Sequence, residues 1–584
     1  MKKFSLNINT KKLIIKKLSV FIAVILLLLV RIVSSEYRTI IYDTNSYSDE
    51  RLMLEYSDLE KHFDPEFENP RTLQKTMTFS WFINLPRKLG ISLNKLLALC
   101  WGLAAILTYL LLLRISRNRI LSLIGYATVL FCPAGFEFNT GVHFYRNLII
   151  APFLFIFFCS LLNILYLSWN PKKTRIISYI IYSVVLSIIY PMCFYIKEDG
   201  FWMKPVLYFF LFTAFIGLVI KLCFIKTLNI KRIFLFLVCL VLPIVNFNIQ
   251  TAKYLKANEK SFNYSDITLR TDGSFASVAN QVYKIASDER TYRFWAPRDA
   301  IKKAIDVSPT LQSMPDLIER IDNFPWYAGT EIPGDFLPWV MLFSLEDTGR
   351  YTNAADIEKI YSKIDEEIRQ AFENGSLKKD QKFQLTKSAG GRSVQEIFLM
   401  FPDIIQLYET VIFLKGYDSS YKMPSQEDQD YIGSFTEQLN QDLTYPSNSK
   451  LRNDFIFKNE IGKKITEIDF NIYRIWIPVL FFTGILSWLL SLLLGFKKIK
   501  PNTLDQWLSL FSVFVLMGIS FAYATGIVWF SEFLVTAGNI QTDEIWRIIF
   551  YGVGIVPMIY LSILIAMCLT WSILKWSYSR LKDR

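Results

Sequence analysis

Apolar stretches that are long enough to cross a bilayer as α-helices recur along the chain, and short polar segments separate them. The stretch Ile120–Cys132 is shorter and stops at Pro133, so we expect a tilted or broken span there. The pattern therefore predicts about ten transmembrane helices. They are Leu13–Val33, Leu93–Leu113, Ile120–Cys132, Leu148–Trp169, Ile176–Tyr195, Pro205–Ile220, Ile233–Phe247, Ile475–Phe496, Trp507–Phe530 and Ile548–Leu574.

One long hydrophilic block, from Thr251 to about Asn471, interrupts this pattern. Within it, apolar residues recur at helical spacing between Ile357 and Phe372, and Asn374-Gly375 is a favourable C-terminal stop. The stretch Val394–Leu414 is more apolar but carries three carboxylates, so we interpret it as a core or interfacial helix and not as a span. The block is long enough to form a folded domain of its own.

The basic residues lie mainly in short turns on alternate sides of the predicted spans. Such turns mark the cytoplasmic side of a membrane protein. We therefore predict a multi-pass protein of the plasma membrane with both termini in the cytoplasm, and with the loop 34–92 and the hydrophilic block outside. The turns that support this orientation contain Arg114, Arg117, Arg119, Lys172, Lys173, Arg175, Lys497, Lys498 and Lys500.

Composition agrees with a membrane protein, because 52% of the residues are hydrophobic and 16% are aromatic. The net charge of +12 could suggest a nucleic-acid partner, but the placement of the charges between spans argues against one. The chain has only two histidines, His62 and His143, which nearly excludes a multi-histidine metal site. The expected fold is an all-α polytopic membrane protein with one mainly helical extracytoplasmic domain. Its predicted parts are a transmembrane region 1–250, the domain 251–471 and a second transmembrane region 472–584.

Three predicted outer loops carry ionisable groups beside apolar segments. Such groups are costly to bury at a membrane edge, so they are solvated, paired or functional. For Arg146 the alternative to a function is contact with lipid headgroups, and for Glu198 and Asp199 it is a solvated turn. His143 is more often a structural contact than a base. The candidates are Asp49, Glu50 and Lys75 in the first loop, His143, Tyr145 and Arg146 in the second, and Glu198 and Asp199 in the third.

Read together, these loops resemble the C-type glycosyltransferase superfamily, and within it a family of bacterial membrane proteins. Members of the superfamily are polytopic enzymes that take a sugar from a polyprenyl-phosphate donor on the outer face of the membrane. The resemblance extends from the first span to about residue 380, and the last three spans add little. It rests on SDERLMLEYS at Ser48–Ser57, TLQK at Thr72–Lys75, CPAGFEFNTGVHFYRN at Cys132–Asn147, YIKEDGFWMKP at Tyr195–Pro205 and IPGDFLPWVMLFSLEDTGRY at Ile332–Tyr351.

The chain departs from the family pattern at three places. Where the family usually has Asp-Asp, Lys-Gly-Pro and Arg-Glu-Glu, this chain has Asp49-Glu50, Lys75-Thr76-Met77 and Lys197-Glu198-Asp199. The first and third changes keep the carboxylates. The loss of Gly-Pro changes the expected shape of the loop after Lys75.

The resemblance implies transfer of a hexose or pentose from a polyprenyl-phosphate donor to a glycan or lipid acceptor of the cell envelope. Such a reaction needs a base for the acceptor hydroxyl and positive charge near the departing phosphate. Asp49 or Glu50 is then the base or a ligand of a divalent metal ion, for which the sequence defines no certain site. Arg146 and Lys75 suit phosphate recognition, and Glu198 and Asp199 suit the acceptor.

Two other classes of function fit the same pattern of spans and loops. One is a non-enzymatic envelope-assembly or transport component, but an ion-coupled transporter is expected to carry acidic groups inside its spans, and these spans have few. The other is a polysaccharide polymerase or ligase, which is expected to depend more on arginine and histidine than on paired carboxylates.

Overall fold

The computed structural model describes residues 8–40, 49–170, 176–224, 230–421, 433, 435–441, 448–497, 499, 502–536 and 544–582. These residues form an all-helical protein without a regular strand; only two isolated bridges, Ile285 to Lys379 and Phe383 to Arg392, pair extended segments. The predicted helical class is confirmed. Of the residues named above, Ser48, Lys172, Lys173, Arg175, Lys498 and Lys500 lie outside the described part, as does the peptide from 537 to 543.

Within the described part, nine helices are long and apolar enough to cross a membrane. The chain thus has the helices of a multi-pass membrane protein. The predicted short span is α7 (Arg119–Leu130), which has only 12 residues, so the count of about ten stays a prediction. The long helices are α1 (Ile8–Ser35), α6 (Leu93–Ser116), α8 (Asn147–Trp169), α9 (Ile176–Phe194), α10 (Met203–Phe224), α11 (Ile230–Phe262), α22 (Ser449–Phe496), α23 (Leu504–Ser531) and α25 (Val556–Lys582), the last preceded by α24 (Glu544–Gly552).

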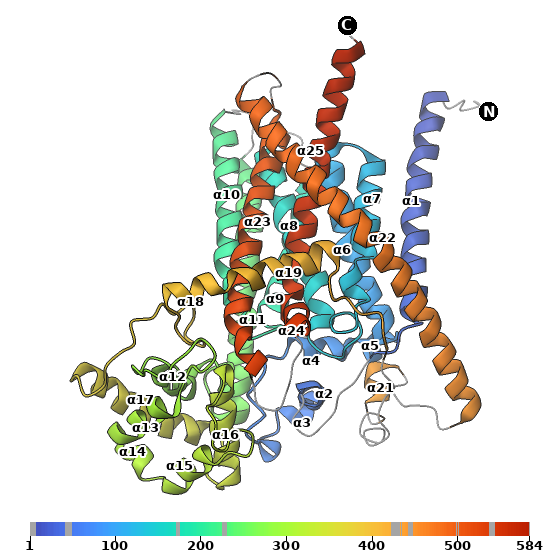
Figure 1. The fold of residues 1–584 in the computed structure, drawn as a ribbon. Coiled ribbons are helices and arrows are strands. Elements are labelled where there is room, and N and C mark those ends of the chain that lie inside the picture. The colour runs from blue at the N-terminus through green and yellow to red at the C-terminus, as the bar shows by residue number, and fades with distance from the viewer. Residues whose placement is uncertain are drawn as a thin grey trace.

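Helix α8 forms the centre of the bundle, with α6, α9, α10 and α25 packed around it (Figure 1). Its sequence is apolar on every side, and residues Asn147 to Ser168 are all buried. A helix without a polar face has to be surrounded by protein or lipid, and here protein surrounds it. Helix α1 lies at the edge of the bundle and exposes many apolar side chains, as a lipid-facing helix does.

The two ends of the described chain lie at the same end of the bundle, and the hydrophilic domain lies at the opposite end, below called the domain side (Figure 1). The domain contains the helix predicted between Ile357 and Phe372: this is α17, which ends at Glu373 and is followed by the capping residue Asn374 and by Gly375 in the left-handed region. Its helices are α12 (Gly273–Val282), α13 (Arg298–Val307), α14 (Pro309–Gln312), α15 (Pro315–Asp322), α16 (Leu337–Asp347) and α17 (Ala354–Glu373).

The stretch predicted not to span forms α18 (Val394–Leu399) and α19 (Phe401–Phe413), which run across the bundle in Figure 1. Neither is among the candidate spans, and Phe398 and Ile405 are exposed apolar side chains. Helices α11 and α22 continue through residues 250 and 471, the expected domain limits. The expected limits therefore fall inside helices, and after α17 the chain returns to the bundle through the segment 374–393 and α18.

Further short elements follow α1 on the domain side and shape the first loop. They are α2 (Asp49–Ser57), α3 (Leu59–His62), η1 (Pro65–Phe67), α4 (Thr78–Ile83) and α5 (Leu85–Leu89). His62 is buried here, and its ring packs against Tyr56, Phe63 and Phe262. Burial lowers the pKa of His62 to about 4, so it is a neutral packing residue at physiological pH.

Candidate functional site

The three predicted loops meet on the domain side and form one charged cluster. Asp49 is the first residue of α2, Lys75 lies in the turn before α4, and Arg146 immediately precedes α8. Glu198 lies between α9 and the short helix η4 (Gly200–Trp202). Residues separated by as many as 149 positions in the sequence therefore lie together at the domain side of the bundle.

Asp49 is the most connected carboxylate of the first loop. Its Oδ2 accepts hydrogen bonds from Lys75 Nζ at 2.8 Å and from the Tyr145 hydroxyl at 2.9 Å. Its side chain keeps 31% of its surface exposed, whereas Lys75 keeps 4%. Burial would raise the pKa of Asp49, but the Lys75 ammonium and the Arg146 guanidinium together hold it below its usual value. Asp49 is thus an ionised carboxylate with one side open.

Glu50 points to a different partner. Its Oε1 is in hydrogen-bond contact with His143 Nε2, and the Glu50 side chain is nearly buried. Burial raises the pKa of Glu50, and the contact with His143 counteracts this only in part. The structure therefore separates the two adjacent carboxylates: Asp49 faces cations, and Glu50 faces an imidazole. His143 makes a polar contact with Glu50, as expected for a structural histidine.

Arg146 and Glu198 form the buried part of the cluster. Arg146 Nη1 lies 2.8 Å and 3.0 Å from the two carboxylate oxygens of Glu198, and Nη2 donates to the Tyr145 hydroxyl at 2.7 Å. The Arg146 side chain is 3% exposed, so it does not reach out to lipid headgroups. Glu198 also accepts from the Thr76 backbone N–H at 3.3 Å, at the place where the chain departs from Gly-Pro.

The pKa of Glu198 reflects the neighbouring cationic side chains. Burial would raise it, but the positive charges of Arg146, Lys75 and Arg270 bring it well below the ordinary value. Glu198 is therefore an ionised group that fixes cations, and not a solvated turn residue. Asp199 behaves differently, because burial raises its pKa more than the neighbouring Lys197 lowers it. All eight predicted residues thus belong to one region. Five of them, Asp49, Lys75, Tyr145, Arg146 and Glu198, form one hydrogen-bonded network, and Glu50 and His143 form a separate pair.

The hydrophilic domain contributes side chains that were not predicted as site residues. Arg270 lies 3.6 Å from Glu198 and 3.2 Å from Asp335, and it shares the face of Trp339 with Lys75. A backbone hydrogen bond from Leu269 N to Leu73 O fixes this loop beside the first one. Asp335 and Trp339 lie in a stretch that carries the resemblance, which was the available signal. Nothing in the local sequence distinguishes Arg270 from other domain arginines.

Lys197 was also not predicted as a site residue. Its Nζ lies 5.7 Å from the ring centre of Tyr145, 5.9 Å from that of Phe550 and 5.5 Å from that of Tyr551. The last two rings belong to α24, more than 350 residues further along the chain. Aromatic faces attract a cation but do not neutralise its charge as a carboxylate does. The arrangement therefore surrounds an ammonium group with three rings.

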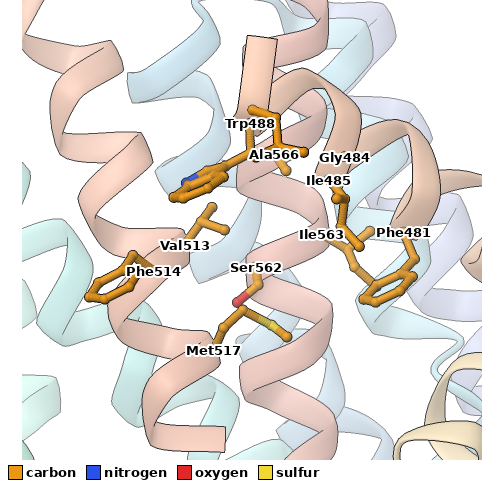
Figure 2. Close-up of a pocket in the computed structure, with 11 residues that line it drawn as sticks. Phe481, Gly484, Ile485, Trp488, Val513, Phe514, Met517, Ser562, Ile563 and Ala566 are labelled. Atoms are coloured by element: carbon orange, nitrogen blue, oxygen red, sulfur yellow. The ribbon is translucent and has the colours of Figure 1, made fainter. Parts of the chain in front are cut away.

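The described residues contain no group of three or more histidine, cysteine, aspartate or glutamate side chains placed to hold a metal ion. A separate apolar cavity of about 220 Å³ lies between α22, α23 and α25 and is lined by Trp488, Phe514 and Ile563, among others (Figure 2). Ser562 supplies one of its few polar atoms. This cavity shares no residue with the charged cluster. We place the candidate chemistry at the cluster, because the ionisable groups converge there.

Comparison of the chain with family models, with curated proteins and with solved structures finds no match in any of the three.

Proposed function

We propose that the protein transfers a sugar from a polyprenyl-phosphate donor to an acceptor of the cell envelope on the outer face of the plasma membrane. The observation that supports this proposal is the partly exposed, ionised Asp49 among Lys75, Tyr145 and Arg146 at the mouth of the bundle. A lipid-linked sugar has to place its phosphate at this depth while its chain stays in the hydrocarbon.

In the proposed reaction an acceptor hydroxyl attacks the anomeric carbon of the donor sugar. The new glycosidic C–O bond forms, the bond between that carbon and the phosphate oxygen breaks, and the polyprenyl phosphate leaves with the electron pair. Asp49 accepts the hydroxyl proton. Because Lys75 and Tyr145 already bind Oδ2, the acceptor is expected to approach the other carboxylate oxygen.

The remaining groups act by position and charge. Arg146 and Glu198 hold each other and the Tyr145 hydroxyl, which in turn orients Asp49. The phosphate role predicted for Arg146 requires one of its Nη atoms to exchange a protein partner for the ligand. Arg270 and Trp339 connect the domain to the site, where the proposal places the acceptor.

The orientation belongs to the proposal as well. In this proposal the domain side is the outer side of the membrane. The short helix α7 also crosses the membrane and brings the number of spans to ten, since an even number of crossings returns the chain to the side where it began. Reporter fusions after Arg117 and Arg580 are expected to report the cytoplasm, and a fusion after Asn374 the outside. A cytoplasmic signal at Asn374 contradicts this orientation.

The proposed activity is tested with membranes that contain the protein and a panel of radiolabelled polyprenyl-phosphate hexoses and pentoses. The wild type is expected to release free polyprenyl phosphate from at least one donor, and Asp49→Asn to lose at least about a hundredfold in rate. Glu60→Gln removes an exposed carboxylate of the same loop and is the matched control. Full activity of Asp49→Asn, at normal membrane abundance, contradicts the assignment of the base.

A further inference from the structure

The cluster contains four cationic side chains, and three of them have a carboxylate within ion-pair distance. Lys75 pairs with Asp49, Arg146 with Glu198, and Arg270 with Asp335 and Glu198. For Lys197 no ion pair within 4.0 Å exists among the described residues. The carboxylates of Asp199 and Glu198 act on it only at longer range.

The surroundings of Lys197 are also chemically distinct. Three aromatic rings lie around its ammonium group, and they come from two different parts of the chain. Burial lowers the pKa of Lys197 to about 8; Asp199 and Glu198 act against this shift, and the positive charges of Arg146 and Lys75 add to it. An anion that enters this position gains a partly desolvated cation without having to displace a carboxylate first.

Position connects Lys197 to the proposed chemistry. The ring of Tyr145 lies under Lys197, and the hydroxyl of the same side chain donates to Asp49. One aromatic residue thus separates the cation from the proposed base. A sugar that lies beside Tyr145 and reaches both groups would have its acceptor side at Asp49 and its leaving group at Lys197.

We propose that Lys197, held by Tyr145, Phe550 and Tyr551, is the side chain that binds the phosphate group of the lipid-linked substrate. This inference rests on the proposed function. The phosphodiester of a donor carries one negative charge, and the phosphate monoester that leaves carries up to two. A cation at this place therefore stabilises the transition state more than the bound donor, so its loss lowers kcat more than it raises KM.

The first test measures the Lys197 amine directly. Purified wild-type protein in detergent is labelled with acetic anhydride across a range of pH, and labelling of Lys197 and Lys204 is quantified by mass spectrometry in the same sample. Lys204 is exposed, lies seven residues away and also faces aromatic rings, Phe194 and Phe247, so it is the internal control. In the free protein we expect Lys197 to label with a midpoint near pH 8.

The ligand arms of this test identify the anion. Undecaprenyl phosphate is expected to slow the labelling of Lys197 at least about fivefold at pH 8, because a bound phosphate raises the amine pKa by about one pH unit or more. Undecaprenol, which lacks the phosphate, and phosphatidylglycerol, which carries the phosphodiester of a bulk lipid headgroup, are expected to protect weakly. Lys204 should respond to none of them. No labelling of Lys197 in the free protein, or equal protection by undecaprenol or phosphatidylglycerol, overturns the proposal.

The second test uses variants and separates this inference from the proposed function. Lys197→Met keeps the length of the stem and removes the charge; it should lower kcat at least about tenfold with a smaller change in KM, and Lys197→Arg should recover part of it. Lys204→Met should resemble the wild type. Phosphate-specific protection of Lys197 in a protein that transfers no sugar keeps the phosphate site and rejects the transferase. Sugar transfer with an unchanged kcat in Lys197→Met keeps the transferase and rejects the phosphate site at Lys197.

Discussion

Glu137, which is buried, and Glu198, which is largely covered, lie on the loops that precede α8 and α10, and they differ in what surrounds them. The carboxylate of Glu137 accepts hydrogen bonds from Asn139 and Thr140 of its own loop. Glu198 instead faces cations from three other segments: Arg146, Lys75 and Arg270. One glutamate organises a turn, and the other gathers distant parts of the chain.

The two pKa values follow these surroundings. Burial raises the pKa of Glu137 to about 7, and the hydrogen bonds from the loop offset only part of the increase. For Glu198 the cations more than compensate for burial and lower the pKa. Polar but uncharged partners thus accommodate a carboxyl near its neutral form, whereas a group of cations keeps it ionised. The comparison indicates that cationic side chains are concentrated around Glu198 and not around Glu137.

The largest effect is expected from Glu198→Gln. The substitution keeps the shape but leaves the buried Arg146 without its carboxylate partner, which typically costs about 3–5 kcal/mol. Because Arg146 and Tyr145 then lose their fixed positions, transfer should fall by at least about a hundredfold. Thermal unfolding in detergent and donor turnover measure the two effects. Glu137→Gln at the same pH is the comparison, and an equal loss of activity there would contradict the difference between the two loops.

A smaller effect is expected from exchanging the arginines. Arg146→Lys keeps a positive charge but cannot bind Glu198 and Tyr145 together, so we expect a loss of about 10–100-fold in kcat with a smaller change in KM. Arg38 is the counterpart beside the Glu137 loop; it donates to the carbonyls of Ser419 and Ser420. Arg38→Lys should reduce thermal stability and leave kcat unchanged. An unchanged kcat in Arg146→Lys would remove the positioning role of its fork.

The sequence predicted the helical class and most spans because apolar length is a local property. It also predicted Asp49, Lys75, Arg146 and Glu198 as candidates, since charged loops beside spans are visible in the chain. It did not predict which carboxylate faces which cation, because those pairs depend on how separate loops meet. Arg270 and the rings of Phe550 and Tyr551 were missed for the same reason: they reach the site from the domain and from α24.

The last prediction concerns Glu137 and pH. Its folded pKa of about 7 lies above the ordinary value of 4.5, so the proton is bound more tightly in the folded state. The stabilisation from this group is therefore complete below about pH 4.5 and is lost as the pH rises through about 7. This rise in pKa corresponds to about 3 kcal/mol, at 1.36 kcal/mol for each pH unit.

Glu137→Gln removes this titration while its amide oxygen can still accept from the backbone N–H groups of Asn139 and Thr140. Arg38, whose charge acts on Glu137, remains in place together with its second carboxylate partner, Asp418. We expect the thermal midpoint of the wild type to fall more steeply between pH 5 and pH 8 than that of Glu137→Gln, with the variant relatively more stable at pH 8. Glu60→Gln should keep the wild-type slope. Because titrations elsewhere are common to all three proteins, parallel slopes in wild type and Glu137→Gln would show that Glu137 is ionised at neutral pH and would remove the contrast with Glu198.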